Sequence, residues 1–175
     1  NDGPEAPPCG DEEILADFER SASLLYRHAG YLALSLSCPN VKGGRDFFSQ
    51  PGNIARLLAR LRSLPVQCPV FLKVAPSQDP ADHERWLEEA GDFDFVRGFI
   101  FNLPPGKPDT IRLSTPRAVW ESMPGAVSGK PVEPLINNCI RELYRRLPAG
   151  RFAIIGAGGV FNAELIDSWI EEKMK

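Results

Sequence analysis

The sequence predicts an α/β protein with parallel strands, of the (β/α)-barrel type, with only part of the eight-stranded barrel present. Apolar segments with the two-residue period of strands alternate four times with segments of helical period, which favours strands joined by helical crossovers. Polar residues able to bind a ligand follow several of these strands, where a (β/α) barrel assembles its active site. A complete barrel typically has about 250 residues, whereas this chain has 175. We therefore expect a single domain over residues 1–175, incomplete at both ends.

The composition is that of an ordinary globular protein, with 43% hydrophobic residues, 25% charged residues and a net charge of -3. No basic stripe with interleaved aromatics indicates nucleic-acid binding, and no apolar run approaches the roughly 20 residues needed to span a bilayer. The four cysteines are scattered, which argues against a zinc site and suits a reducing compartment. Because no targeting pattern opens the sequence, we expect an intracellular protein, cytoplasmic or peripherally membrane-associated.

The first predicted helix and strand precede a stretch of residues that could bind or react with a ligand. Acidic residues at 11–13 favour a helix N-terminus, and the alternating leucines of 31–36 indicate a strand that ends at Cys38-Pro39. A thiol at the end of a strand can face a ligand, although a lone cysteine usually only packs. Asn40 adds a hydrogen-bonding amide, and the glycines at 43 and 44 let the backbone approach a ligand closely.

The next strand carries an unusual charge. A second helix is expected after Gly52, where apolar residues keep helical spacing up to Pro65. The strand over 70–75 is apolar except for Lys73. A buried ammonium group is costly unless it meets an anion or strong acceptors, so Lys73 requires a partner. The alternative is a lysine that snorkels from the end of the strand.

A third helix begins at Asp79-Pro80, and a third strand runs over about 95–101 and ends at Asn102. Asn102 either faces a ligand or makes a local turn. The following residues, 103–134, show no convincing periodicity, and so long a connection is usually functional or mobile. The two histidines, His28 and His83, both fall in predicted helices, where surface or packing roles are expected.

The last helix of clear periodicity is expected over residues 135–147. Ser128 and Gly129 precede it and can offer a hydroxyl and backbone N–H groups to a ligand. Taken alone, such a turn is more often only a turn.

A fourth strand is expected over 152–155, followed by a glycine-rich turn and a helix from about Asn162. Gly158 and Gly159 would let backbone N–H groups converge on a phosphate near the positive end of that helix. Glycine-rich turns of this kind are common, and the spacing of a dinucleotide site is not met.

In order along the chain, these segments resemble the signatures of the dihydroorotate dehydrogenases, the flavin enzymes of pyrimidine synthesis. Ser37-Cys-Pro-Asn-Val-Lys42 is similar to the catalytic loop of their cysteine class, and Val70-Phe-Leu-Lys-Val-Ala-Pro76 to their second signature. Ala126-Val-Ser-Gly-Lys-Pro131 and Ile140-Arg-Glu-Leu-Tyr144 resemble the serine class, and Gly156-Ala-Gly-Gly-Val160 the phosphate-binding glycines. The resemblance covers nearly the whole chain, but only the central and later part of a dehydrogenase.

This resemblance implies an oxidoreductase that uses FMN to oxidise dihydroorotate to orotate in pyrimidine biosynthesis. It implies that Cys38 is the general base, that Asn40 and Asn102 bind the substrate, and that hydride passes to the flavin. The residues that it assigns to flavin binding are Lys73, Ser128, Gly129, Gly158 and Gly159. A quinone is the electron acceptor that the serine class would imply.

Three features depart from the family pattern. Ser35 stands where these enzymes carry a substrate-binding asparagine, Leu103 follows Asn102 in place of the usual threonine, and signatures of two classes occur together. Two alternatives therefore stay open: a flavin reductase for another substrate, and a barrel remnant or paralogue that acts as a non-catalytic binding module. A genuine half barrel would also have to cover its open edges through a partner, such as a second copy in a homo-oligomer.

Overall fold

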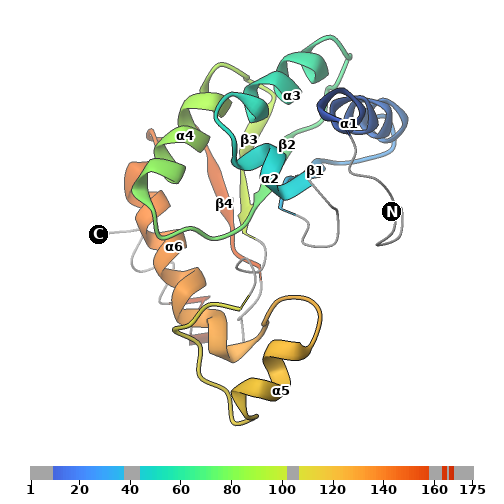
Figure 1. Ribbon diagram of the computed structural model, residues 1–175. Helices are drawn as coiled ribbons and strands as arrows, with labels where there is room; N and C mark the ends of the chain where they lie inside the picture. The colour runs from blue at the N-terminus through green and yellow to red at the C-terminus, as the bar shows by residue number, and fades with distance from the viewer. Residues whose placement is uncertain (1–9, 38–43, 102–106, 158–162, 165, 168–175) are drawn as a thin grey trace.

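The computed structural model describes residues 10–37, 44–101, 107–157, 163, 164, 166 and 167. Its centre is a parallel sheet of four strands that keep their sequence order (Figure 1). The strands are β1 (Leu32–Ser35), β2 (Val70–Val74), β3 (Val96–Phe101) and β4 (Ala153–Ile155). The helices are α1 (Asp11–Leu25), α2 (Gly44–Ser49), α3 (Asn53–Arg62), α4 (Pro80–Gly91), α5 (Arg117–Ser122), the 3-10 turn η1 (Lys130–Val132) and α6 (Glu133–Arg146). The predicted alternation of parallel strands and helices is confirmed.

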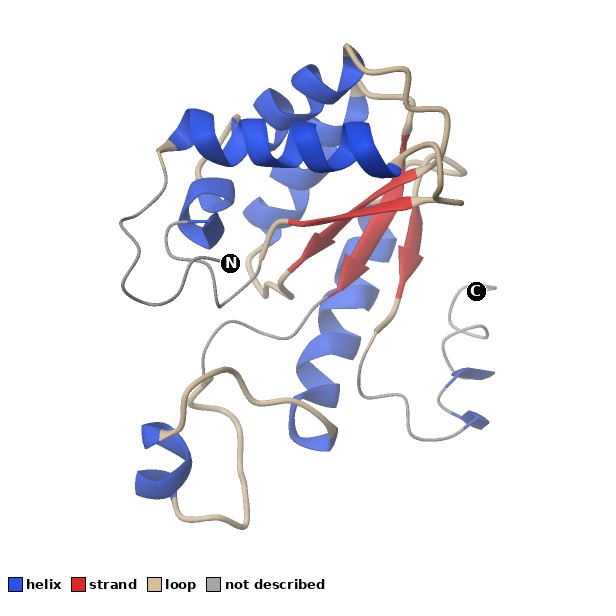
Figure 2. Ribbon diagram, turned by 90° about the vertical axis from the view of Figure 1, so that its right-hand side faces the viewer, coloured by secondary structure: helices blue, strands red, loops and turns tan. Residues whose placement is uncertain are grey.

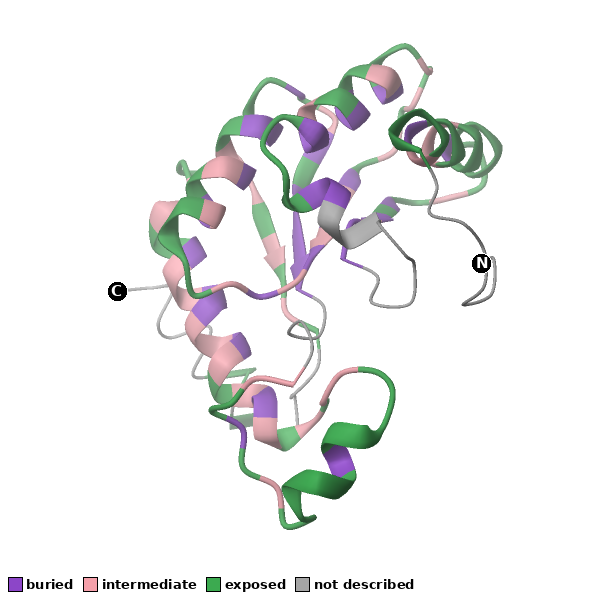
Figure 3. Cartoon of the chain, viewed as in Figure 1, coloured by how far each residue is buried: buried purple, intermediate pink, exposed green. Residues whose placement is uncertain are grey.

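One face of the sheet is packed and the other is not. The register aligns Leu34 with Leu72 and Leu72 with Phe99, and all three side chains are buried in the core. The helices α1, α3, α4 and α6 lie along this face (Figure 2), and the strands β1, β2 and β3 each contain buried residues (Figure 3). On the opposite face Ala33 and Ile155, in the two outer strands, are exposed, whereas Ile100 in β3 is only 9% exposed. The described residues therefore form a two-layer α/β unit with one uncovered sheet face.

A buried carboxylate joins two of the helices. Glu89 of α4 accepts hydrogen bonds from the backbone N–H groups of Gly52 (2.9 Å) and Ala55 (3.0 Å), at the N-terminus of α3. These are donors that the first turn of a helix cannot satisfy within itself. A negative charge there also complements the helix dipole. The α3 helix, which has no capping side chain of its own at Gly52, is thus capped by α4.

The strands β3 and β4 approach each other unusually closely at Gly98. A Cβ atom at this position would lie 1.9 Å from the carbonyl oxygen of Ala153. No side chain fits there without moving one of the two strands. Glycine is therefore required at Gly98 by the packing of the backbone.

The sequence did not predict two short helices, and the first helix that it predicted extended beyond the observed one. The α1 helix ends at Leu25, so His28 lies in an exposed turn after it and not inside a helix. The helices α2 and α5 have six residues each, too few for a helical period to stand out in the sequence. The α5 helix interrupts the segment for which no periodicity was found, and this segment extends beyond the carboxyl ends of the strands (Figure 1). Among the described helices, none is long and apolar enough to cross a bilayer.

Candidate active site

A row of four residues crosses the uncovered face of the sheet near the carboxyl ends of the strands. The register pairs Ser35 with Lys73, Lys73 with Ile100, and Ile100 with Ile155. Residues paired across neighbouring parallel strands point to the same face. The row therefore presents a hydroxyl and an ammonium group side by side, followed by two apolar side chains.

Lys73 carries the one charge in this row. Its neighbours in the strand, Leu72 and Val74, face the helices and are 0% and 3% exposed, whereas Lys73 is half-buried on the opposite face. Among the described residues, β2 is therefore buried on its helix face and half-buried on the other. Within them no side chain or carbonyl group bonds to the Lys73 ammonium. A charge held on a half-buried surface, with no partner in the part of the chain that the structure describes, suits an anionic or electron-rich ligand.

Five of the predicted site residues lie outside the residues that the structure describes: Cys38, Asn40, Asn102, Gly158 and Gly159. The strands that precede them in the sequence are β1, β3 and β4, and all run parallel. Parallel strands have their carboxyl ends at one edge of a sheet, which is the active-site edge of a (β/α) barrel. Their roles stay predictions.

Ser128 and Gly129 lie in the turn before η1. Gly129 has φ 84° and ψ −155°, a conformation that residues with a side chain rarely adopt. Within the next helix, Asn138 donates to the side chain of Gln78 (2.6 Å), and Gln78 donates to the carbonyl oxygen of Leu135 (3.3 Å). The start of α6 is thus bonded to the loop that follows β2. Lys73 lies within β2 itself, so these hydrogen bonds do not reach it.

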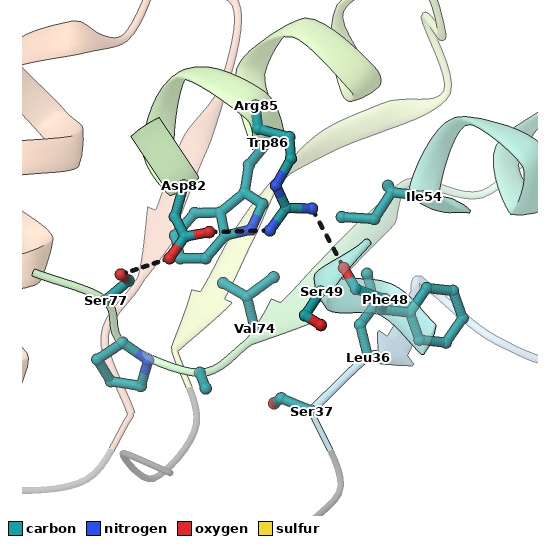
Figure 4. Close-up of a pocket in the computed structure, with 12 residues that line it drawn as sticks. Leu36, Ser37, Phe48, Ser49, Ile54, Val74, Ser77, Asp82, Arg85 and Trp86 are labelled. Atoms are coloured by element: carbon teal, nitrogen blue, oxygen red, sulfur yellow. Dashed lines mark hydrogen bonds and ion pairs between the residues drawn. The ribbon is translucent and has the colours of Figure 1, made fainter. Parts of the chain in front are cut away.

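A cavity of about 190 Å³ lies on the other side of these strand ends, between the sheet and the helices (Figure 4). Its apolar walls are Leu36, Phe48, Ile54, Val74 and Trp86. Because Leu36 and Val74 alternate with Ser35 and Lys73 along their strands, the cavity and the row of Lys73 are on opposite faces of the sheet.

Polar side chains form one rim of this cavity (Figure 4). Ser77 donates a hydrogen bond to Asp82 (2.6 Å), and Arg85 binds Asp82 (3.0 Å) and the carbonyl oxygen of Phe48 (3.2 Å). Burial alone would raise the pKa of Asp82, but the hydrogen bond from Ser77 and the hydrogen bond and charge of Arg85 lower it below its usual value. The rim is therefore an ionised, fully paired network.

This network was not predicted from the sequence. Asp82, Arg85 and Glu89 are spaced three and four residues apart, which places them on one face of α4. That face also carries Trp86 and Ala90, both buried. The spacing was a readable signal that these three charges lie on the same helix face as the apolar residues.

Comparison with known proteins gives the family. A sequence model of the dihydroorotate dehydrogenases matches residues 9–171, which is most of the chain. The chain belongs to the dihydroorotate dehydrogenase family. This confirms the resemblance seen in the sequence.

Several curated dihydroorotate dehydrogenases are similar to this family member. The chain is 33% identical over 162 residues to "Dihydroorotate dehydrogenase (quinone)" of Clavibacter michiganensis subsp. michiganensis, covering 91% of this chain and 45% of that protein. The protein of the same name from Anaeromyxobacter sp. (strain Fw109-5) is 32% identical over 157 residues, covering 88% of this chain and 42% of that protein. The chain therefore spans less than half the length of these dehydrogenases.

A solved structure supports the fold. The dihydroorotate dehydrogenase of Eimeria tenella, crystallised in complex with ferulenol, superposes with a TM-score of 0.68 at 21% identity. The match covers 91% of this chain and 45% of that chain. The prediction of a (β/α)-barrel type fold, present in part, is confirmed.

One buried histidine and one buried cysteine of this dehydrogenase relative lie together away from the uncovered face. His83 Nε2 is 3.0 Å from the carbonyl oxygen of Ser77 and 3.6 Å from Cys139 Sγ, and the two side chains are 1% and 0% exposed. Burial raises the pKa of Cys139 to about 12, so the thiol stays protonated. The pair packs α4 against α6 and is not a nucleophile with its base. For His83 the expected packing role is confirmed.

Proposed function

We propose that the complete protein oxidises dihydroorotate to orotate with FMN, in pyrimidine biosynthesis. The support is membership of the dihydroorotate dehydrogenase family, together with one structural observation. Lys73 lies on the uncovered face near the carboxyl ends of the strands, without a partner among the described residues.

The residues present fit a flavin on this face. The ammonium of Lys73 would bind the electron-rich edge of the flavin ring, and apolar Ile155 in the same row, 38% exposed, offers a surface on which a ring can lie. The turn at Ser128 and Gly129, and the glycines at 158 and 159, would supply a hydroxyl and backbone N–H groups to its ribityl and phosphate groups. When bound, FMN supplies the acceptor for the hydride.

For the chemistry we assign the proton to Cys38. Its sulfur would take the proton from the ring carbon next to the acid-bearing carbon of dihydroorotate, while the acid-bearing carbon loses the hydride. Asn40 and Asn102 would orient the ring through their amides. A quinone is the proposed electron acceptor, because the matched relatives carry the name dihydroorotate dehydrogenase (quinone).

The test uses flavin binding and turnover as separate readouts. Lys73→Met should weaken FMN binding, measured by the flavin absorbance retained after gel filtration. Arg20→Met, which removes an exposed charge of α1, should leave flavin binding unchanged. In the complete gene product, Cys38→Ser should lower dihydroorotate oxidation sharply and leave the flavin bound. Unchanged oxidation in Cys38→Ser would remove this thiol from the mechanism, and a protein that takes up no FMN would favour a non-catalytic binding module.

A second candidate function is a flavin oxidoreductase for another substrate. It is favoured by Ser35, which occupies the position next to Lys73 in the row where the resemblance implies a substrate-binding asparagine. A serine side chain is shorter and offers one hydroxyl in place of an amide. Ser35→Asn separates the two functions. If dihydroorotate is the substrate, the restored amide should raise dihydroorotate turnover. If the substrate is another molecule, dihydroorotate turnover should not rise.

A further inference from the structure

The size of the cavity in Figure 4 limits what it can hold. Its volume is about 190 Å³. An apolar cavity of about 150 Å³ is large enough for benzene, whereas sites for drug-sized ligands span about 300–1,000 Å³. The cavity therefore admits one substituted ring and is too small for a flavin.

The walls of the cavity are fixed by the core. Ile54 is 1% exposed, Val74 3% and Trp86 5%, and each belongs to the main hydrophobic cluster. The Trp86 ring also packs against His83 and Phe99, with ring centroids 5.3 Å and 6.5 Å apart. Closing the cavity would require these side chains to leave well-packed positions. The space is therefore a formed site for an apolar ring.

The charges at the rim select against an acid. The two charged residues that line the cavity, Arg85 and Asp82, bind each other (3.0 Å), and Arg85 also faces Glu89 (3.6 Å), which is outside the lining, so no positive charge at the rim is left unpaired. The rim has no excess positive charge for a carboxylate or phosphate, and it offers acceptor oxygens to a neutral donor. We propose that this cavity is a second binding site, on the helix side of the sheet, for a single uncharged ring with a hydroxyl or N–H donor, such as a phenol or an indole.

The experiment titrates phenol, indole and benzoate into the protein and follows the backbone amide resonances by NMR. Phenol and indole should shift the amides of residues 36, 37, 74, 75 and 77 with a dissociation constant of about 1 mM, as expected for so few atoms. Benzoate should bind at least about tenfold more weakly, because its carboxylate would lose water without meeting an unpaired positive charge. No shift with phenol or indole at about 10 mM, ten times the expected constant, would overturn the site. Equal binding of benzoate would overturn the charge argument.

Variants locate the binding. Val74→Phe fills the cavity and should abolish the phenol shifts, whereas Ala33→Phe adds the same ring on the uncovered face and should preserve them. If Val74→Phe does not fold, Ser49→Trp narrows the cavity from an exposed position on its lining and serves the same purpose. If phenol still binds to whichever of Val74→Phe and Ser49→Trp is folded, the probe binds outside the cavity and the proposal is refuted. The result does not depend on FMN or dihydroorotate, so it stands apart from the proposed oxidation.

Discussion

The cap that Glu89 provides to α3 allows a sharp test of the fold. The carboxylate accepts two backbone N–H groups at 2.9 and 3.0 Å, and its side chain is 8% exposed. A hydrogen bond to a charged group contributes about 1.5–3 kcal/mol. In Glu89→Gln, one acceptor oxygen becomes an NH2 group that faces an N–H donor, so one hydrogen bond is lost. We expect the free energy of unfolding to fall by about 2–3 kcal/mol. In Glu89→Leu both bonds are lost and one of the two carboxylates beside Arg85 is removed, so the expected loss is about 3–5 kcal/mol.

The assay is urea unfolding followed by circular dichroism, with midpoints compared at equal slopes. The matched control is Glu88→Gln, one residue earlier on the exposed side of α4, which should change the unfolding free energy by less than about 0.5 kcal/mol. If Glu89→Gln is as stable as the control, the capping of α3 by α4 does not contribute to stability and the reasoning fails.

Three further predictions concern buried positions. Gly98→Ala should destabilise the protein by about 3 kcal/mol or prevent folding, because its Cβ would overlap the backbone of β4. The control is Gly30→Ala, where a Cβ meets nothing within 4 Å. Equal melting temperatures of the two variants would contradict the close contact between β3 and β4. Burial, which outweighs the hydrogen bond to Ser77, lowers the pKa of His83 below 6.5. The unfolded chain therefore binds the proton more readily, so this part of the stability is complete above pH 6.5 and is lost as the pH falls toward the folded pKa. Urea midpoints from about pH 7.5 to about pH 5.5 should fall less steeply in His83→Leu than in the wild type, and parallel curves would contradict this. Finally, Cys139 should resist a thiol reagent in the folded protein while the half-buried Cys68 reacts; mass spectrometry of the labelled peptides checks the order, and early labelling of Cys139 would show that α4 and α6 separate readily.

Much of the fold could be predicted because the strands and long helices show the periodicity of apolar residues that is typical of each. The alternation in 31–36 and the lone Lys73 in an apolar strand were readable without any tertiary information. The position of Lys73 on an uncovered face was not, because an apolar strand buried on one face reads like one buried on both.

The charged residues on the inner face of α4 show a different limit. Asp82, Arg85 and Glu89 find their partners in Ser77, Phe48 and Gly52, and the last two lie more than 30 residues earlier in the chain. Their spacing marks one helix face, but only tertiary packing decides whether that face meets solvent or another helix. For the candidate site, the strand ends were predictable, while the pairing of Ser35 with Lys73 required the sheet register.

The order of the strands has a practical consequence. Among the described residues, β1 and β4 each pair with one neighbour only, and so each offers a row of backbone groups to another chain. Two molecules that meet at these margins would mask each other's amides, and the extent would grow with protein concentration. Hydrodynamic size should therefore be recorded across a dilution series before any melting curve or ligand titration on this polypeptide is interpreted.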